Sequence, residues 1–322
     1  MTMAATVATT RTTRCAGITP DYLRHSGITG SGVRRRARLK GMQPRLVITG
    51  AGGQLGSVLA VEAARRGRDV LALASSQWDI TDPAAAEKNI QSGDVVLNCA
   101  AYTNVDGAET DEARAHAVNA EGPEHIARVC ADVGARMIHV STDYVFSGSA
   151  STPYEPDDET GPLSAYGRTK LSGEVAVLKT LPEGTVVRTA WVYTGGAGND
   201  FVAAMRRLAA GDGVVEVVDD QTGSPTYVGD LAAALLQVAD DGVDAPVVHA
   251  ANAGAVSRFE QARAVFAEVG ADPERVHPIS SDKNPRPAPR PRYSVLGSRL
   301  STEAGLTPLR PWRDALAAAL RA

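Results

Sequence analysis

Short apolar segments alternate with helical segments along most of the chain, and this alternation restricts the possible folds more than any other feature. Each apolar segment is almost continuously apolar, which is typical of a strand buried on both faces. Between these segments, apolar residues recur at helical spacing. A parallel sheet covered by helices on both faces is therefore predicted. The predicted strands lie at residues 45–49, 69–74, 94–100, 136–141, 185–190 and 247–250.

After residue 195 the alternation is less regular, and a smaller α/β lobe is predicted there. Helices are expected at 199–210, 257–270 and 311–321, with a short strand at 214–218. Ser257 and Glu260 have the spacing of a capping box, which marks the start of a helix. The predicted fold class is α/β, with a doubly wound parallel sheet and a smaller C-terminal α/β lobe.

Charge is distributed unevenly along the 322 residues, whose formal net charge is −4. Residues 1–41 hold eight basic residues and one acidic residue, a net charge of +7, so the other 281 residues carry −11. Such an acidic body disfavours nucleic acid as a partner. The basic head is expected to be disordered and dispensable. The alternatives are a targeting peptide, or an upstream start with Met42 opening the domain.

Cysteine and histidine usage argues against a disulfide scaffold and against a metal site. Cys15, Cys99 and Cys130 are widely spaced, and the six histidines never fall at the spacing of metal ligands. Cys99 and Cys130 lie in apolar patterns, so they are expected to be small core residues of a reduced, cytoplasmic protein. The sequence has no run of about 18 apolar residues, which argues against a membrane-spanning helix.

A glycine-rich turn follows the first predicted strand and opens the first predicted helix. Gly50, Gly53 and Gly56 surround Gln54 and Leu55 in the spacing of a dinucleotide-binding turn. The first glycine permits the tight turn, the second lets a pyrophosphate approach, and the third allows the helix to pack on the strand. The helix N-terminus then offers free N–H groups to the anion. This context predicts a Rossmann-type sheet; the alternative is a merely glycine-rich turn.

The end of the second predicted strand bears on the choice of dinucleotide. NAD sites often place a carboxylate there for the ribose 2′-hydroxyl. This chain has Ser75 and Ser76 instead, which favours NADPH because a 2′-phosphate meets no repulsion. NADH stays possible, since no arginine replaces the carboxylate. Asp79 and Ile80 are expected beside the adenine.

Tyr166 and Lys170 are four residues apart on a predicted helix and therefore share one of its faces. A cation near a phenol favours the phenolate, so we expect Lys170 to lower the pKa of Tyr166 and make it a proton donor near neutral pH. Ser141 and Thr142 end a predicted strand, where ligands bind in parallel sheets. A hydroxyl there can bind the carbonyl oxygen that Tyr166 protonates. The alternative is an ordinary surface pair on a helix.

Six segments, in a fixed order from about Arg45 to the C-terminus, carry a family resemblance. In combination they are far more specific than any one alone. The chain resembles the extended short-chain dehydrogenases/reductases and, within that superfamily, the dTDP-4-dehydrorhamnose reductases. The segments are Gly52-Gly-Gln-Leu-Gly56, Asn98-Cys-Ala-Ala-Tyr-Thr-Asn-Val-Asp106, Ser141-Thr-Asp-Tyr-Val-Phe-Ser-Gly148, Tyr166-Gly-Arg-Thr-Lys170, Arg188-Thr-Ala-Trp-Val-Tyr193 and Asp220-Gln-Thr-Gly-Ser-Pro-Thr226.

The resemblance implies the last step of dTDP-L-rhamnose biosynthesis, in which NADPH reduces the C4 keto group of dTDP-4-dehydro-β-L-rhamnose. It implies that Tyr166 donates the proton, Thr142 polarises the carbonyl, and Lys170 holds the nicotinamide ribose. Dehydratases of the superfamily usually carry an acidic pair after the threonine, and its absence here favours a reductase. Residues that would line the cofactor are Ala100, Ala101 and Thr103.

Substrate contacts are expected at strand ends and in the C-terminal lobe. Tyr144 and Trp191 suit a sugar ring or a thymine, and core packing is an equal alternative for Trp191. Arg206 can offset diphosphate charge, and Arg290 belongs either to the site or to a solvated loop. Asn119 either holds a water-linked proton path or is a helix-breaking polar residue. The predicted substrate-binding residues are Thr142, Asp143, Tyr144, Trp191, Asn199, Phe201, Arg206, Gln221, Thr226 and Arg290.

The predicted NADP-binding Rossmann domain comprises residues 42–192 with about 224–253, and the substrate-binding lobe comprises about 193–223 with 254–322. A dTDP-sugar is the expected partner, and the protein is expected to be a monomer or a homodimer. Some family members share a magnesium ion between subunits through an acid that is replaced here by Val58, so a magnesium site is doubtful. The alternatives are a non-catalytic binding subunit on the same fold, or a sugar-nucleotide epimerase or dehydratase.

Overall fold

Six parallel strands form the central sheet in the order β10-β5-β4-β3-β1-β2. The computed structural model describes residues 43–196 and 198–321, so the predicted basic head lies outside the described residues. The chain places β2 on one side of β1 and then crosses to place β3 on the other, which makes the β1/β3 boundary the topological switch point. The strands are β1 (Leu46–Thr49), β2 (Val70–Leu73), β3 (Val95–Asn98), β4 (Arg136–Thr142), β5 (Thr185–Thr189) and β10 (Val247–His249).

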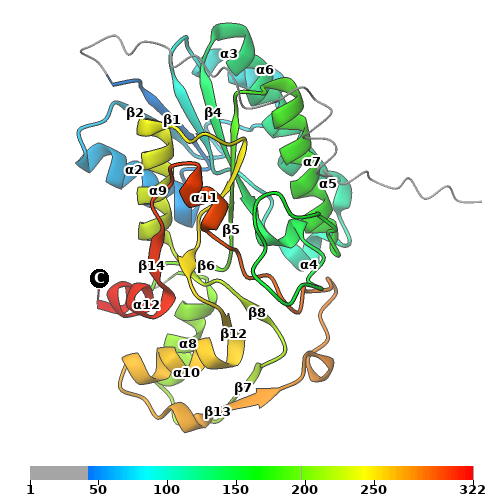
Figure 1. Cartoon of the computed structure of the whole chain (residues 1–322), viewed down its shortest axis with the longest axis vertical. Coiled ribbons are helices and arrows are strands. Elements are labelled where there is room, and N and C mark those ends of the chain that lie inside the picture. Colours follow the sequence, from blue (N-terminus) through cyan, green and yellow to red (C-terminus); the bar gives the residue numbers. More distant parts are fainter. Residues whose placement is uncertain (1–42, 197, 322) are drawn as a thin grey trace, which may run out of the picture.

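Alternate residues of each strand build two separate cores, one on each face of the sheet. On one face Leu46 and Ile48 pack with α2 (Gln54–Arg65) and α9 (Val228–Asp241). On the other face Val47 packs with three helices that follow one another around the sheet (Figure 1). Because successive side chains of a strand point to opposite faces, nearly continuous apolar strands are what such a sheet requires. The three helices are α3 (Pro83–Asn89), α6 (Gly122–Val133) and α7 (Ala165–Thr180).

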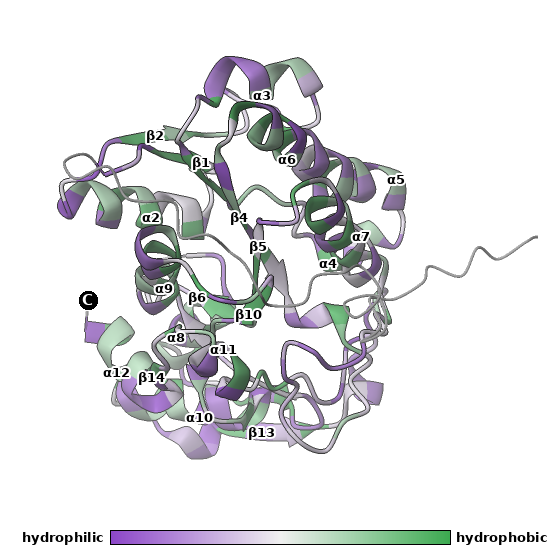
Figure 2. Cartoon of the chain, turned by 45° about the horizontal axis from the view of Figure 1, so that its top comes forward, coloured by the Kyte–Doolittle hydropathy of each residue, from purple (hydrophilic) through white to green (hydrophobic). Residues whose placement is uncertain are grey.

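A third core lies below the carboxyl ends of the strands, between α8, α10 and α12 (Figure 1). Its helices are α8 (Phe201–Ala209), α10 (Arg258–Glu268) and α12 (Trp312–Arg321). Figure 2 shows the central strands largely in hydrophobic colours, whereas the surrounding helices are mixed. The paired short strands around this core are β6 (Val192–Tyr193) with β9 (Thr226–Tyr227), β7 (Val215–Val218) with β13 (Val276–Ile279), β8 (Thr222–Gly223) with β12 (Val256–Ser257), and β11 (Asn252–Ala253) with β14 (Leu309–Pro311).

Short helical turns connect these elements near the carboxyl edge of the sheet. A π-helical turn, η1 (Ala117–Glu121), directly precedes α6. The remaining turns and short helices are α4 (Val105–Ala108), α5 (Glu112–His116), η2 (Asp143–Val145), η3 (Pro273–Arg275), η4 (Ser281–Lys283) and α11 (Arg299–Glu303).

The predicted fold class is confirmed, and so is the capping box: the Ser257 hydroxyl accepts from the Glu260 amide, and the Glu260 carboxylate accepts from the Ser257 amide. Cys130 is buried in the core that contains Val47, and Cys99 packs against the core on the other face of the sheet. Both are free thiols. None of the described helices is long and apolar enough to cross a membrane.

Candidate active site

The glycine turn between β1 and α2 has the backbone geometry that the sequence predicted. Gly50 has φ +66°, and a Cβ there would lie 2.7 Å from the backbone nitrogen of Ala100. A Cβ on Gly56 would collide with the Gly50 carbonyl oxygen, so the helix packs directly on the turn. At Gly53 a Cβ would lie 3.3 Å from the same oxygen. Contacts within the protein therefore require glycine less strictly at this position than at Gly50 or Gly56. This difference leaves the Gly53 side of the turn as the face that a ligand can approach.

The N-terminus of α2 fits the pyrophosphate of a dinucleotide. Its cap residue is Gly53, no side chain caps the helix, and the first turn contains no acidic residue. The amides of Gln54 and Leu55 therefore face the turn without competition from a side-chain acceptor. Free N–H groups and the helix dipole favour a bound anion. The Gln54 side chain donates to the Asp200 carboxylate at 3.2 Å, which ties the turn to the start of α8.

The residues predicted beside the adenine are only partly available to a ligand. The Asp79 carboxylate is exposed and accepts from the amide and hydroxyl of Thr81, which lowers its pKa. Ile80 is buried in the core, where its side chain packs closely over Gly122. The core therefore holds most of the Ile80 side chain, and the expected place of Ile80 beside the adenine stays a prediction.

The segment after β3 lies beside the glycine turn. The Ala100 amide donates to the Thr49 hydroxyl at 3.3 Å, and Ala100 is the residue that Gly50 approaches. Ala101 is partly exposed and Thr103 is exposed. These three predicted cofactor-lining residues therefore follow a strand end at the switch point of the sheet, where ligands of such sheets bind.

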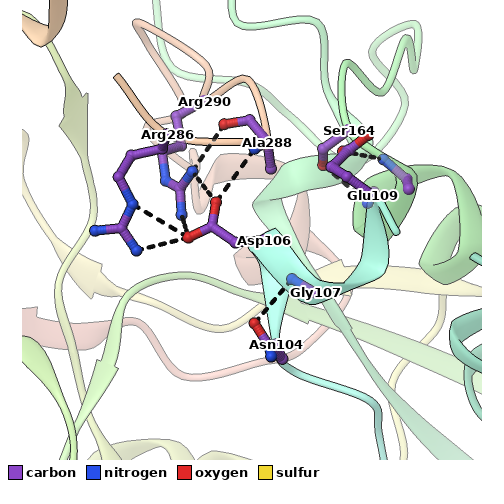
Figure 3. Close-up of polar contacts among 10 residues, drawn as sticks. Asn104, Asp106, Gly107, Glu109, Ser164, Arg286, Ala288 and Arg290 are labelled. Carbon is purple, nitrogen blue, oxygen red and sulfur yellow. Dashed lines mark hydrogen bonds and ion pairs between the residues drawn. The ribbon is translucent and has the colours of Figure 1, made fainter. Parts of the chain in front are cut away.

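Thr142 and Tyr166 meet at the carboxyl end of β4. Thr142 is the last residue of β4, Tyr166 lies in the first turn of α7, and their side chains are hydrogen-bonded. The start of α7 is fixed by Ser164, whose hydroxyl accepts from the Gly167 amide, and by Glu109, whose carboxylate accepts from the Ala165 amide at 2.8 Å (Figure 3).

Lys170 follows one turn later and is almost fully buried. Its ammonium donates to the Val140 carbonyl at 2.7 Å. Burial lowers the pKa of Lys170 to about 8, although the charges of Glu174 and Cys99 oppose this shift. The structure thus brings Thr142, Tyr166 and Lys170 to one end of one strand and helix.

The predicted effect of Lys170 on Tyr166 is wrong for the protein by itself. Burial raises the pKa of Tyr166 above its ordinary value, and the hydrogen bond with Thr142 offsets only part of that rise. Desolvation of the phenolate outweighs any effect of the Lys170 ammonium, which donates to the Val140 carbonyl. Tyr166 is therefore a protonated hydroxyl at neutral pH, which is the form that a proton donor needs.

Asp143 accepts a hydrogen bond from Thr142 in the protein interior. It is buried, accepts from the Thr142 hydroxyl at 3.0 Å and accepts from the Ser294 hydroxyl at 2.6 Å. Burial raises its pKa to about 6 against both hydrogen bonds. Tyr144 packs edge-on against Tyr166, with ring centroids 5.5 Å apart. Asp143 is thus an internal anchor, and Tyr144 lies beside the candidate proton donor.

Trp191 forms an aromatic platform with Arg258 on it. Trp191 has φ +47° and is the one described non-glycine residue with a positive φ; its indole also occupies the space that a Cβ on Gly223 would need. The Arg258 guanidinium lies 3.5 Å from the centroid of the Trp191 ring and 4.8 Å from that of Phe201. Backbone strain of this kind concentrates at functional sites, so the arrangement favours a ligand role over simple packing.

Sequence reasoning missed Arg258. Within residues 43–196 and 198–321 its guanidinium forms no ion pair, and it donates only to the Gln261 side chain at 3.2 Å. Burial lowers its pKa to about 10, whereas the charges of Tyr144 and Asp143 act in the opposite direction. The available signal was its place directly after the Ser257 cap, since the helix dipole disfavours a cation at a helix N-terminus.

Arg290 is held by the carboxylate of a residue far from it in the sequence. Asp106 of α4 accepts from Arg290 at 2.7 Å and from Arg286 at 2.6 Å, and it also accepts from the Ala288 amide (Figure 3). These arginines hold the pKa of Asp106 well below its usual range. The loop of residues 283–292 is therefore attached to the segment after β3, and the charges of Arg290 and Tyr144 interact.

Thr226, Arg206 and Asn199 lie apart from this group, whereas Gln221 contacts it through its backbone. Thr226 is fully buried and its hydroxyl donates to the Ser224 carbonyl, a structural role in place of the predicted contact. The Arg206 guanidinium donates to the Gly195 carbonyl and lines a surface cavity of about 360 Å³ at the ends of α8 and α10. Asn199 is exposed before α8, and the Gln221 carbonyl accepts from the Arg258 amide at 3.2 Å.

The Asn119 side chain forms hydrogen bonds to two other segments of the protein. Its side-chain oxygen accepts from the Tyr102 amide at 2.9 Å, and its nitrogen donates to the Tyr102 carbonyl and to the Thr169 hydroxyl. The π-helical turn thereby fastens α7 to the segment after β3. No group of three or more potential metal ligands from His, Cys, Asp and Glu occurs in the described part of the chain.

The glycine turn at the switch point and the tyrosine–lysine helix flanking β4 define the class of protein: a Rossmann-type enzyme fold of the extended short-chain dehydrogenases/reductases. The family model described as the RmlD substrate binding domain matches residues 44–322. A dTDP-4-dehydrorhamnose reductase from Mycobacterium tuberculosis is 69% identical over 288 residues, which cover 88% of this chain and 95% of the relative. The chain belongs to the dTDP-4-dehydrorhamnose reductase family.

Solved structures of that family have the same architecture. The dTDP-4-dehydrorhamnose reductase from Clostridium acetobutylicum is 38% identical, with a TM-score of 0.82 over 86% of this chain and 98% of that chain. The enzyme from Bacillus anthracis, solved in complex with NADP, is 34% identical, with a TM-score of 0.81 over 85% of this chain and 98% of that chain.

Proposed function

We propose that the protein reduces the C4 keto group of dTDP-4-dehydro-β-L-rhamnose to give dTDP-L-rhamnose, with NADPH as the reductant. The observation that carries this proposal is the hydrogen-bonded Thr142–Tyr166 pair beside buried Lys170, at the strand edge that also bears the glycine turn. Support comes from the M. tuberculosis relative, which is named for this reduction, and from the B. anthracis structure, which contains NADP.

The bound dinucleotide would supply hydride to C4 of the hexose. The Thr142 hydroxyl holds the carbonyl oxygen in place, for which it must leave Asp143 and turn toward the ligand. Tyr166 donates its phenolic proton to the developing alkoxide, and its raised pKa keeps that proton available at neutral pH. Lys170 supplies a buried positive charge one helical turn from the phenolate that remains.

The cofactor would be held by the turn at Gly50–Gly56, the first-turn amides of α2, and Ala100, Ala101 and Thr103. Ser75 and Ser76 are exposed and leave room for a 2′-phosphate, which supports NADPH over NADH. Residues 42–192 with about 224–253 would form the dinucleotide-binding domain. Residues of about 193–223 with 254–322 would form the lobe that covers the sugar nucleotide.

On the substrate side, Arg258 takes the role that the sequence assigned to Arg206. A half-buried guanidinium without an ion-pair partner suits a diphosphate, and Arg258 lies on the Trp191 platform and within the field of Tyr144. Tyr144 and Trp191 supply flat faces for the sugar or the thymine. The proposed location is the cytoplasm, where free thiols stay reduced. The proposed oligomeric state is a monomer or a homodimer.

The proposal is tested by mixing purified protein with dTDP-4-dehydrorhamnose and NADPH and following the absorbance of the reduced nicotinamide. We expect NADPH oxidation with the wild type. The Tyr166→Phe variant should lose turnover by a factor of about 10² or more and keep its affinity for NADPH. Tyr193→Phe is the matched control, because the Tyr193 hydroxyl is buried without a partner. NADPH binding without oxidation would instead indicate a non-catalytic subunit.

A further inference from the structure

A row of three polar side chains crosses the sheet beneath the candidate active site. Thr49 of β1 is the register partner of Asn98 of β3, and Asn98 is the register partner of His139 of β4. Their exposed fractions are 1%, 0% and 0%. We call these three residues the polar row. Each lies two positions after an apolar residue of the core on the α6 and α7 face, as Thr49 does after Val47, so the polar row lies on that same face.

Hydrogen bonds connect the polar row from end to end. The Thr49 hydroxyl donates to the Asn98 side-chain oxygen at 2.6 Å, and the Asn98 side-chain nitrogen lies 2.9 Å from Nδ1 of His139. The other ring nitrogen, Nε2, lies 3.5 Å from Nζ of Lys170. Gly173 lies beside this ring nitrogen: a Cβ there would be 3.5 Å from Nε2, an ordinary contact, but would collide with the Asn119 carbonyl oxygen.

The Asn98 contact fixes the tautomer of His139. An amide nitrogen has hydrogens and no free lone pair, so Nδ1 must be the acceptor. Burial and the charge of Lys170 lower the pKa of His139 well below its ordinary value, so the ring is neutral. A neutral imidazole with a bare Nδ1 carries its hydrogen on Nε2. The ring therefore turns an N–H bond, and not a lone pair, toward the lysine.

An N–H bond that faces an ammonium is repulsive, whereas it can donate to a neutral amine. The ammonium instead donates to the Val140 carbonyl at 2.7 Å. We propose that the polar row positions Lys170: it turns the Nε2–H of His139 toward Nζ and favours the neutral amine of this lysine. Burying polar side chains costs free energy, and the polar row then has a function beyond packing.

The consequence for catalysis rests on the proposed function. Tyr166 loses one proton in each reduction and must regain it. A proton released from Nζ of Lys170 restores the Tyr166 hydroxyl, and a proton from solvent water then restores the ammonium: one N–H bond breaks as one O–H bond forms, the N–H bond is remade, and no oxidation state changes. His139 stabilises the neutral amine that this transfer leaves. The other titratable groups facing Lys170 are Glu174 on its own helix and Cys99 after β3, and both favour the ammonium.

The tautomer is measured directly by long-range ¹H–¹⁵N correlation spectra of protein labelled with ¹⁵N-histidine. The His139→Gln variant identifies the signals of His139 among those of the six histidines. We expect a protonated Nε2 and an unprotonated Nδ1 near pH 7. A protonated Nδ1 would overturn the proposal. Thr49→Val removes the hydroxyl that orients Asn98 and leaves the ring in place, so it should mix the two tautomers.

The effect on Lys170 is measured from the titration of its side-chain ¹³C signal, which Lys170→Arg assigns. His139→Asn keeps an acceptor for Asn98 and removes the N–H facing the lysine, so the midpoint should rise by about one pH unit. His139→Gln retains an N–H donor at that position and should keep the wild-type midpoint. An unchanged midpoint in His139→Asn would refute the proposal, and so would a rise of equal size in both variants.

His249→Asn is the matched control, because His249 is also fully buried, with its Nδ1 near the Gly297 carbonyl. It should lose stability without moving the Lys170 midpoint. Should His139→Asn not fold, Thr49→Val provides the same comparison, with a smaller rise expected. Both measurements need no substrate, so they give the same answer whether or not the proposed reduction occurs.

Discussion

Replacing Glu174 by glutamine should destabilise the protein strongly. The Glu174 carboxylate is 0% exposed and pairs with Arg188, whose side chain is 2% exposed, at 2.7 Å. Arg188 also donates to the Pro156 carbonyl at 3.1 Å and stacks over the Phe146 ring, while Ser141 donates to the same carboxylate. Glutamine has nearly the same shape, so the variant removes charge with little change in volume.

The expected loss is large because the variant leaves a buried cation without its counter-charge. Breaking a buried ion pair in this way costs about 3–5 kcal/mol, which for a chain of this size lowers Tm by about 5–15 °C. Urea unfolding followed by circular dichroism gives the free energy of unfolding. Glu62→Gln is the control, because Glu62 pairs with Arg65 at the surface and such pairs contribute about 1 kcal/mol or less.

Two results would contradict this reasoning. A loss below about 1 kcal/mol in Glu174→Gln would show that the buried pair contributes no more than a surface pair. A double variant, Glu174→Leu with Arg188→Met, should recover part of the loss, because apolar groups of similar volume need no counter-charge. Failure to recover would indicate that packing, and not the unpaired charge, caused the loss. Because Glu174 favours the ammonium of Lys170, the single variant should also lower the Lys170 titration midpoint.

Three further predictions follow from the site. Arg258→Gln should weaken dTDP binding about tenfold or more in calorimetry and leave thymidine binding unchanged. Arg263→Gln of the same helix is the control. Equal losses of affinity for both ligands would exclude a role of Arg258 in diphosphate binding. Gly53→Ala should fold but bind NADPH poorly in fluorescence titrations, whereas Gly56→Ala should lose about 1–3 kcal/mol because its Cβ meets backbone. The raised pKa of Asp143, about 6, makes the folded state favour its proton, so stability falls as pH rises from about 4 to above 6. Asp143→Asn should remove about 1.4 kcal/mol of this pH dependence between pH 5 and 8, and an unchanged difference in urea unfolding would exclude Asp143 as its source.

Much of the fold and part of the site were predictable because they depend on local spacing. Continuous apolar strands predict burial on both faces, and the glycine spacing after β1 predicts a turn that the structure confirms with φ +66° at Gly50. The four-residue separation of Tyr166 and Lys170 places both on one face of α7. These features need only the periods of helices and strands.

The tertiary structure decided what depends on distant segments and on burial. Whether Tyr166 ionises easily was set by desolvation, which outweighs the lysine charge and reverses the predicted shift. The Arg258–Trp191 stack joins residues 67 positions apart, and the polar row joins three strands whose neighbours are set by the order of the sheet. Local patterns fix which face a side chain takes. Only the packing of the whole chain fixes which side chains meet across that face and how much water reaches them.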